Sequence, residues 1–431
     1  MRRHRWLTPA LLLTVALAVI AAGCGGDDGG GGGGDVSGEL AITAIWTGPE
    51  QEAFEEVLAG FTEENPDVEV TYTSGGDQLP TQLATAVEGG NPPDLAVLGQ
   101  PGLVRDFAAK DALQPLDFAA ADIEENLGQS AVDLGTVEGT LYGFLFKAAN
   151  KSTVWYNVAA FEEAGVEPPE TWEDFLAAAD TLKSSGLPAY SIGGADGWTL
   201  TDLFENIYLR TAGAEKYDQL AAHEIPWTDQ SVKDALTEMA KVVGATDNIA
   251  GGAAGALQTD FPTSVSNVFS ANPKAAQVIE GDFVPGAVET GLEPETDYNV
   301  FPFPAINDSP ASVVGGGDTV VMFKDSPAAQ ALVTYLTTAE AAQIWAERGG
   351  YATLNKGLDT GAYPDPITET TAGAIGEAEV FRFDLSDLQP AEFGGTVGQG
   401  LFKLFQDFLK NPEDVDGIAQ QMEDAAAKAF G

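Results

Sequence analysis

The sequence predicts an α/β protein with a mostly parallel sheet, organised as two lobes. Segments with strand-like and helix-like patterns alternate between residues 40 and 98, as they do in βαβ units. With 431 residues, the chain can bury a large core in one two-lobed unit or in two domains. Two strand-like runs at 141–146 and 153–157 enclose a polar break, the pattern expected where a chain passes from one lobe into another.

The first strand and the first helix are expected at the start of the alternating region. The run at 40–46 has the length and composition of a strand, and Thr47-Gly48-Pro49 follows it as a turn. Residues 50–64 predict an amphipathic helix, because apolar side chains recur at positions i, i+3, i+4 and i+7. These side chains are Phe54, Val57, Leu58 and Phe61.

The alternation continues to residue 98. The next expected elements are a strand at 68–72, a helix at 79–87 and a buried strand at 95–98. Ligands of parallel sheets bind outside the carboxyl ends of the strands. Residues 46–50 and 98–100 are therefore expected at the rim of a cleft.

Helix signals follow the second strand-like run. A short helix carries Phe161, and Pro168-Pro169 stops it. Thr171 is expected to cap the next helix, with Glu173 and Asp174 in its first turn. The last third of the chain predicts further helices, at 327–347, 401–409 and 415–430.

The charge balance excludes two classes of partner. The chain has 20 Lys and Arg residues against 66 Asp and Glu residues, a formal net charge of −46. Such a surface repels nucleic acids and anionic lipid headgroups, so neither is an expected partner. Because salt screens this self-repulsion, the composition also suggests adaptation to a high-salt environment.

The N-terminal residues have the pattern of a lipoprotein signal peptide. Residues 1–23 combine a cluster of arginines with an apolar run that is shorter than a typical transmembrane helix. The run ends in Ala21-Ala22-Gly23-Cys24, which resembles a lipobox, although Ala21 replaces the more usual Leu. Cys24 is therefore the expected lipidation site, and residues 24–37 are the lipidated cysteine and a flexible Gly-rich tether. The alternative is an ordinary secreted protein whose signal contains a cysteine.

The middle of the chain resembles a known family. In order, it contains Tyr142-Gly143, Lys147, Trp155-Tyr156-Asn157, Phe161-Glu162-Glu163-Ala164-Gly165 and Pro169-Glu170-Thr171-Trp172. This order resembles the extracellular solute-binding protein family 1, the sugar-capturing subunits of bacterial ABC importers. Further motifs resemble its α-glucoside-binding branch, at 192–198, 259–261, 301–304, 315–318, 344–350 and 381–387. The resemblance extends over most of residues 38–415.

The resemblance implies a type II-like periplasmic-binding-protein fold, with a hinge between two α/β lobes and the ligand in the interlobe cleft. The implied first lobe is 38–147 plus 303–348, and the implied second lobe is 152–298 plus 354–431. Three crossovers would join them, near Lys147–Ser152, Tyr298–Pro304 and Arg348–Leu354.

The resemblance also implies a function. The chain would be a monomeric, non-enzymatic lipoprotein at the outer face of the cell membrane. It would capture an α-linked disaccharide, such as trehalose, maltose or sucrose, and deliver it to the ABC permease subunits by hinge closure. No cofactor is expected.

Aromatic side chains are the first candidates for contacts with a sugar, because the apolar faces of a sugar ring pack on aromatic rings. Four aromatic residues lie beside a glycine or a turn, where the family often has an aromatic: Trp46, Trp198, Phe283 and Tyr351. For each of them, packing in the core is the alternative. Three other tryptophans lie in regular elements and are expected in the core: Trp155, Trp172 and Trp345.

Polar side chains are needed for the sugar hydroxyls. Glu50 begins a helix after the first strand, where complementing the helix dipole is the alternative role. Asp318 follows three glycines, which allow close approach of the backbone to a ligand, or it is simply a turn residue. Arg382 and Asp384 are expected on one face of a strand, as sugar contacts or as a structural ion pair. The family pattern adds Asp94, Gln100, Lys147, Asp202 and Asp260, although Asp94 could instead cap a strand.

Other functions are less well supported by the sequence. Asp384 with Asp387, or Glu50 with Asp318, could form the carboxylate pair of a lipid-anchored glycoside hydrolase, but 66 acidic residues produce such pairs by chance. His223 is the only histidine after the signal, and no calcium-loop or phosphate-loop motif occurs, so no metal site is expected. A binding protein for a non-sugar solute remains the other alternative.

Overall fold

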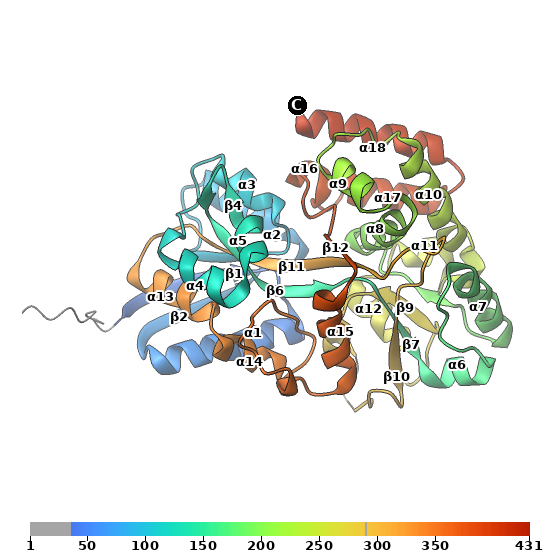
Figure 1. The fold of residues 1–431 in the computed structure, drawn as a ribbon, viewed down its shortest axis with the longest axis horizontal. Coiled ribbons are helices and arrows are strands. Elements are labelled where there is room, and N and C mark those ends of the chain that lie inside the picture. Colours follow the sequence, from blue (N-terminus) through green and yellow to red (C-terminus); the bar gives the residue numbers. More distant parts are fainter. Residues whose placement is uncertain (1–35, 289–290) are drawn as a thin grey trace, which may run out of the picture. The chain divides into compact units, whose positions relative to one another are not determined.

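The computed structural model describes residues 36–288 and 291–431, and residues 36–431 form one compact unit. The predicted signal peptide, the lipidation site Cys24 and the glycine run of the tether lie outside the described residues. Within this unit, two sheets organise the chain, with helices packed around each of them (Figure 1).

The first sheet contains the alternating N-terminal strands. Its order is β12-β11-β3-β1-β2, with β6 also paired to β11. The strand β1 pairs in parallel with β2 and β3, as the alternation predicts, whereas β11 pairs antiparallel with β3 and β6. The strands are β1 (Ser37–Ala44), β2 (Asp67–Ser74), β3 (Leu95–Leu98), β6 (Gly143–Asn150), β11 (Ser312–Met322) and β12 (Val380–Phe383).

The second sheet has four strands in the order β10-β7-β9-β8. Its strand β7 pairs antiparallel with both β9 and β10, so this sheet is not the parallel type predicted for the N-terminal region. The strands are β7 (Thr153–Asn157), β8 (Tyr190–Ser191), β9 (Gln277–Glu280) and β10 (Tyr298–Pro302). A separate short pair is formed by β4 (Thr136–Val137) and β5 (Thr140–Leu141).

Helices cover both sheets. Those in the N-terminal part are α1 (Gly48–Glu64), α2 (Leu79–Glu88), α3 (Gly102–Ala108), α4 (Ala120–Leu127) and α5 (Gln129–Gly135). The middle part contains α6 (Val158–Ala164), α7 (Trp172–Ser185), α8 (Trp198–Ala212), α9 (Ala214–Ala221), α10 (Gln230–Val243), α11 (Gly252–Ala256) and α12 (Phe261–Ser266). The C-terminal part contains α13 (Pro327–Leu336), α14 (Ala339–Ala346), α15 (Pro366–Glu377), α16 (Ala391–Gly394), α17 (Gly400–Lys410) and α18 (Val415–Phe430).

Short 3₁₀ turns supplement these helices at 76–78, 117–119, 246–248, 284–287 and 360–362. No helix in the described ranges is both long enough and apolar enough to cross a membrane.

Local sequence signals place the helix ends. The Thr171 hydroxyl accepts a hydrogen bond from the Asp174 backbone N–H at 3.2 Å, so the predicted cap of α7 is confirmed. Gly165 ends α6 in the left-handed region at φ 65°, which glycine adopts without strain. The four apolar residues predicted to form the inner face of α1 are all buried.

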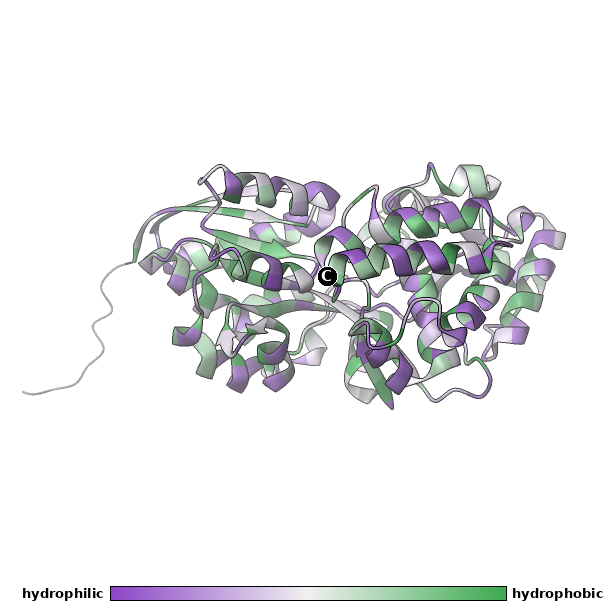
Figure 2. Ribbon diagram, turned by 90° about the horizontal axis from the view of Figure 1, so that it is seen from above, coloured by the Kyte–Doolittle hydropathy of each residue, from purple (hydrophilic) through white to green (hydrophobic). Residues whose placement is uncertain are grey.

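Each sheet has its own hydrophobic core. One core packs the first sheet against α1, α13 and α14, and the other packs the second sheet against α7, α8, α10, α17 and α18. The three tryptophans predicted in the core, Trp155, Trp172 and Trp345, are all buried. Figure 2 shows the same division, with hydrophobic strands inside and hydrophilic residues along the outer faces of the helices.

The chain passes between the two sheets in two places, and a third segment leads from the first sheet into the second core. It leaves the first sheet after β6 through Lys151–Ser152 to β7, and it returns between β10 and β11. After β12, Leu385, Phe393 and the apolar residues of α17 and α18 belong to the second core, whereas Leu388 still packs against the first. Residues Leu354, Leu358 and Tyr363 still pack against the first core, well beyond the predicted third crossover. The exact lobe boundaries stay a prediction. We propose that the third crossover between the lobes lies at the end of β12 rather than near Arg348–Leu354.

Candidate ligand-binding cleft

Residues of the first sheet, together with helices and loops that pack around the second sheet, line a cavity of about 370 Å³. The segments that follow β1 and β3 contribute Thr47, Glu50, Gly99 and Gln100, so the cleft rim predicted from the sequence is confirmed. The other polar and aromatic lining residues are Trp46, Asp77, Lys147, Lys151, Asp196, Trp198, Asp260, Phe261, Phe283, Asp318, Asp387 and Phe402.

Most of the residues predicted from the sequence meet in this cavity. Eight of them line it: Trp46, Glu50, Gln100, Lys147, Trp198, Asp260, Phe283 and Asp318. Two more, Asp202 and Asp384, contact the lining residue Lys151 from behind. Three lie elsewhere: Asp94, Tyr351 and Arg382.

Three aromatic rings form one wall of the cavity. The centroid of the Trp198 ring lies 5.4 Å from that of Phe261 and 6.0 Å from that of Phe283. The rings of Phe261 and Phe283 are 5.3 Å apart and nearly perpendicular, at 74°. Partly exposed rings in such a cluster offer apolar faces to the ring carbons of a sugar. We call Trp198, Phe261 and Phe283 the aromatic wall.

Trp46 belongs mainly to the core. Its ring packs against Phe54 at 4.6 Å and Trp345 at 4.7 Å between centroids, and the residue is 2% exposed. Its indole N–H donates to Asp318 Oδ2 at 2.7 Å. The tryptophan therefore reaches the cavity with an edge and fixes the orientation of Asp318.

Lys147, Glu50 and Asp318 form a charged group next to the aromatic wall. The ammonium of Lys147 donates to Glu50 Oε1 at 2.6 Å and lies 4.0 Å from Asp318 Oδ2. It also lies 5.5 Å from the centroid of the Phe283 ring. Burial alone would lower the pKa of Lys147, but the two carboxylates raise it above its ordinary value. Burial raises the pKa of Asp318 to about 6, against the opposing effect of Lys147.

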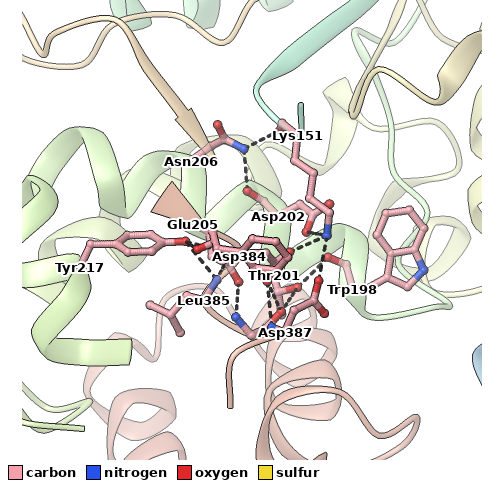
Figure 3. Close-up of polar contacts among 12 residues, drawn as sticks. Lys151, Trp198, Thr201, Asp202, Glu205, Asn206, Tyr217, Asp384, Leu385 and Asp387 are labelled. Atoms are coloured by element: carbon pink, nitrogen blue, oxygen red, sulfur yellow. Dashed lines mark hydrogen bonds and ion pairs between the residues drawn. The ribbon is translucent and has the colours of Figure 1, made fainter. Parts of the chain in front are cut away.

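Lys151 holds a second charged group at the crossover between β6 and β7 (Figure 3). Its ammonium donates to Asp384 Oδ2 at 2.5 Å, to Asp202 Oδ1 at 3.2 Å and to Asp387 Oδ2 at 3.5 Å. It lies 5.8 Å from the centroid of the Trp198 ring. We call Lys151 and these three aspartates the Lys151 cluster.

Protonation within the Lys151 cluster is unevenly divided. Burial raises the pKa values of Asp202 and Asp387 well above the ordinary range, and the neighbouring Asp384 raises them further. Burial also acts on Asp384, but Lys151 and hydrogen bonds outweigh it and lower the pKa of Asp384 to about 2. Asp384 is therefore the ionised partner of Lys151.

The helix α8 attaches the Lys151 cluster to the second core. Glu205 on α8 accepts hydrogen bonds from the backbone N–H groups of Leu385 at 2.7 Å and Ser386 at 2.9 Å. Tyr217 donates to the same carboxylate at 3.1 Å (Figure 3). The segment that follows β12 is thereby held against α8.

Glycines in β11 make room for this arrangement. A Cβ atom on Gly316 would lie 2.6 Å from Cε of Lys151, and one on Gly315 would clash with the Phe381 ring. The three glycines before Asp318 predicted either a close approach of the backbone to a ligand or a turn, and Gly317 does line the cavity. In the structure, Gly315 and Gly316 instead allow side chains of the protein itself to pack on the strand.

The three remaining predicted residues have structural contacts instead. Tyr351 is buried, stacks on Trp345 at 5.3 Å and donates to the Phe146 carbonyl. Asp94 accepts a hydrogen bond from the Ala41 N–H at 2.7 Å, which ties the entry of β3 to β1. Tyr351 therefore has its alternative role of packing in the core, and Asp94 has its alternative role of capping a strand.

Arg382 does not face Asp384 as predicted. It forms a bidentate pair with Asp218, at 2.6 and 2.9 Å. Arg382 therefore has the structural ion pair that was its alternative role, but with Asp218, while Asp384 follows the last residue of β12 and pairs with Lys151.

Sequence reasoning missed several lining residues. Asp77, Asp196 and Phe261 were not singled out, although Asp196 and Phe261 lie inside motifs that carry the family resemblance. Lys151 lies in the polar break that marked the crossover, and Asp387 entered only as a possible hydrolase carboxylate. The sequence did contain a signal for Phe261, because it directly follows the predicted site residue Asp260. A residue that caps a helix and the residue after it lie at the same helix end.

No group of three or more His, Cys, Asp or Glu residues in the described ranges has an arrangement that could hold a metal ion.

Comparison with known proteins identifies similar sequences. The model of the bacterial extracellular solute-binding protein family matches residues 47–343. The osmoprotective compounds-binding protein GgtB of Synechocystis is 36% identical over 371 residues, covering 84% of this chain and 86% of that protein. The alpha-glucosides-binding periplasmic protein AglE of Rhizobium meliloti is 35% identical over 384 residues, covering 85% of this chain and 82% of that protein.

Solved structures share the fold at low sequence identity. The bacterial solute receptor AcbH superposes with a TM-score of 0.82 at 22% identity, covering 92% of this chain and all of that one (100%). The GacH receptor of Streptomyces glaucescens superposes with a TM-score of 0.73 at 19% identity, covering 91% of this chain and 98% of that one. These proteins are two-lobed, and the α/β fold with a cleft between two lobes predicted from the sequence is confirmed.

Proposed function

Because the chain belongs to the bacterial extracellular solute-binding protein family, we propose that it captures an α-linked disaccharide for an ABC importer. The observation that carries the proposal is one cavity that combines the aromatic wall with Glu50, Gln100 and Asp318. Aromatic faces suit the C–H faces of a sugar, and fixed carboxylates and amides suit its hydroxyls. Trehalose, maltose and sucrose are the ligands we expect.

The names of similar proteins support this ligand class. AglE is named for binding alpha-glucosides, and GgtB for binding osmoprotective compounds. The second name leaves room for a related non-sugar solute, which a broader ligand panel can detect.

Hinge closure is the mechanism we propose for capture. The lining residues come from segments that pack around both sheets, so we expect a bound sugar to bridge the two lobes and to favour the closed state. The closed protein then docks on the permease subunits, and ATP hydrolysis there drives release. No step in this cycle requires bond cleavage in the ligand, and we propose that the protein is a monomer without enzymatic activity.

Membership of the family implies a location outside the cytoplasm. We further propose that an acyl chain on Cys24 holds the protein at the outer face of the membrane, with the Gly-rich segment as a leash. Mass spectrometry of the protein from its native membrane tests this proposal, because an unmodified or absent Cys24 would contradict it.

Calorimetric titration of residues 36–431 tests the ligand assignment. The panel is trehalose, maltose, sucrose, glucose and β-linked cellobiose as a control. We expect one-to-one binding of an α-disaccharide and no release of monosaccharide. If no sugar of the panel binds, the α-glucoside assignment is wrong. If monosaccharide is released, the protein is instead a glycoside hydrolase.

Trp198→Ala tests the aromatic wall. Removing this ring should weaken disaccharide binding at least about 30-fold, because the ring loses its stacking area on the sugar. Phe118→Ala is the control, since Phe118 is exposed and does not line the cavity. Equal affinities of the two variants would exclude the aromatic wall as the sugar platform.

A further inference from the structure

The charged residues that line the cavity are predominantly acidic. Six carboxylates line it against two ammonium groups, with no arginine or histidine among the described lining residues. The acids are Glu50, Asp77, Asp196, Asp260, Asp318 and Asp387, and the cations are Lys147 and Lys151.

Both cations are already occupied by carboxylates of the protein. Lys147 donates to Glu50 at 2.6 Å, and its side chain is only 4% exposed. Lys151 is surrounded by the three aspartates of the Lys151 cluster. An anionic ligand would therefore have to displace a carboxylate from a short, charge-assisted hydrogen bond.

Two helix N-termini at the cavity, those of α1 and α12, are occupied in the same way, whereas α2, α3, α8 and α17 begin near it without a side-chain cap. Glu50 lies in the first turn of α1. At the start of α12, Asp260 accepts from the Thr263 N–H at 2.9 Å, and Asp196 accepts from the Phe261 N–H at 2.6 Å. The positive ends of both helices therefore face carboxylates of the protein itself.

We propose that this cleft selects uncharged sugars and rejects anionic ones, such as sugar phosphates and uronic acids, because Glu50 occupies Lys147. This inference rests on the proposed function and specifies its ligand class. Glu50 is the specificity-determining residue. Its side chain is 32% exposed and faces the cavity, whereas the ammonium that it covers is buried.

Removing the charge of Glu50 should release Lys147 for an anionic ligand. In Glu50→Gln, the amide cannot form an ion pair with the ammonium, but it can still bond to sugar hydroxyls. Asp318 lies 4.0 Å from Lys147 and is the next carboxylate in range, so the release is partial. The variant should therefore gain affinity for anions without losing the neutral sugar completely.

Glu55→Gln is the matched control. Glu55 is on the same helix α1, is exposed, and bonds only to Gln51 among the described residues. The substitution removes the same charge from the molecule but touches neither the cavity nor Lys147. A difference between the two variants therefore reports the position of the charge rather than the net charge.

The experiment titrates residues 36–431 with trehalose, maltose and sucrose and with the 6-phosphate ester of each. We expect every phosphate ester to bind at least about 100-fold more weakly than its parent sugar. In Glu50→Gln, the ratio of the dissociation constants of ester and parent sugar should fall at least about tenfold. In Glu55→Gln, the same ratio should change by no more than about twofold. A thermal melt establishes that both variants are folded.

Each outcome separates the two proposals. Phosphate esters that bind as tightly as the parent sugars would overturn the charge selectivity and leave the proposed sugar-binding function intact. An unchanged ratio in Glu50→Gln would overturn the assigned role of Glu50. If no neutral disaccharide binds, the proposed function fails, and this inference fails with it.

Discussion

At the residue scale, Lys151 is the side chain on which most of the buried charge depends. It lies at the first connection between the sheets and touches Asp202, Asp384 and Asp387. A buried carboxylate that loses its cation is strongly destabilising, because its charge is left unpaired in a low-dielectric environment. The effect of removing Lys151 should also depend on pH, because unpaired carboxylates can bind protons.

Lys151→Met should lower the free energy of unfolding by about 3–5 kcal/mol at pH 7. In the parent protein, the lowered pKa of Asp384 stabilises the fold above the unfolded-state pKa, and this contribution disappears as the pH falls toward 2. In the variant, Asp384 has no cation, so its pKa rises and protonation restores part of the stability. The difference in unfolding free energy between the parent protein and Lys151→Met should therefore be smaller at pH 4 than at pH 7, as measured by urea denaturation.

The control for this prediction is Lys183→Met. Lys183 pairs with Asp247 at 3.0 Å, but the two side chains are 42% and 84% exposed. An exposed pair contributes only about 0–1 kcal/mol. If Lys151→Met is no more destabilising than this control, the Lys151 cluster does not stabilise the fold.

At the element scale, α8 contacts both connections between the sheets and the segment that follows β12. Asp202, Asn206 and Arg210 recur every four residues, so they lie on one face of the helix. Asn206 donates to the Lys151 carbonyl at 2.8 Å, and Arg210 donates to the Ser312 carbonyl at 2.6 Å. Trp198 begins the same helix at the cavity, so α8 contacts both the connecting segments and part of the aromatic wall.

Asn206→Ala should destabilise the protein by about 2–4 kcal/mol. The substitution leaves the Lys151 carbonyl without this donor and removes the acceptor of Ser152 and Arg210. Thr211→Ala is the control on the same helix, since within the described part of the chain its hydroxyl bonds only to carbonyls of α8. Equal melting temperatures for the two variants, measured by calorimetry, would show that α8 does not fasten the hinge through Asn206.

At the scale of the whole molecule, the net charge of −46 opposes the compact state. Salt shortens the Debye length from about 10 Å at 0.1 M to about 3 Å at 1 M, which screens the repulsion between exposed carboxylates. Buried groups such as the Lys151 cluster are screened much less.

The melting temperature should therefore rise as NaCl increases from about 0.1 to 1 M. NaCl and KCl should have equal effects at equal concentration, because screening depends on ionic strength rather than on the cation. A melting temperature independent of salt would contradict the suggested adaptation to high salt. A large difference between the two salts would indicate specific ion binding instead of screening.

The sequence by itself determined the local structure of this protein. The i, i+3, i+4 spacing of α1, the Thr171 cap and the alternation of strands and helices all act within a few residues, so they can be read from neighbouring positions. The rim of the cleft was predictable too, because parallel strands end on one edge of a sheet. The motifs that carry the resemblance led to the same family that the comparisons identify.

Only the tertiary structure decided which charged groups meet. Lys151 and Asp384 are separated by 233 positions, and Arg382 pairs with Asp218 across 164. With 66 acidic residues in the chain, no local pattern selects one carboxylate for a given cation. That choice depends on how α8, β11 and the end of β12 pack together, because the energy of an ion pair is set by distance and burial rather than by sequence spacing.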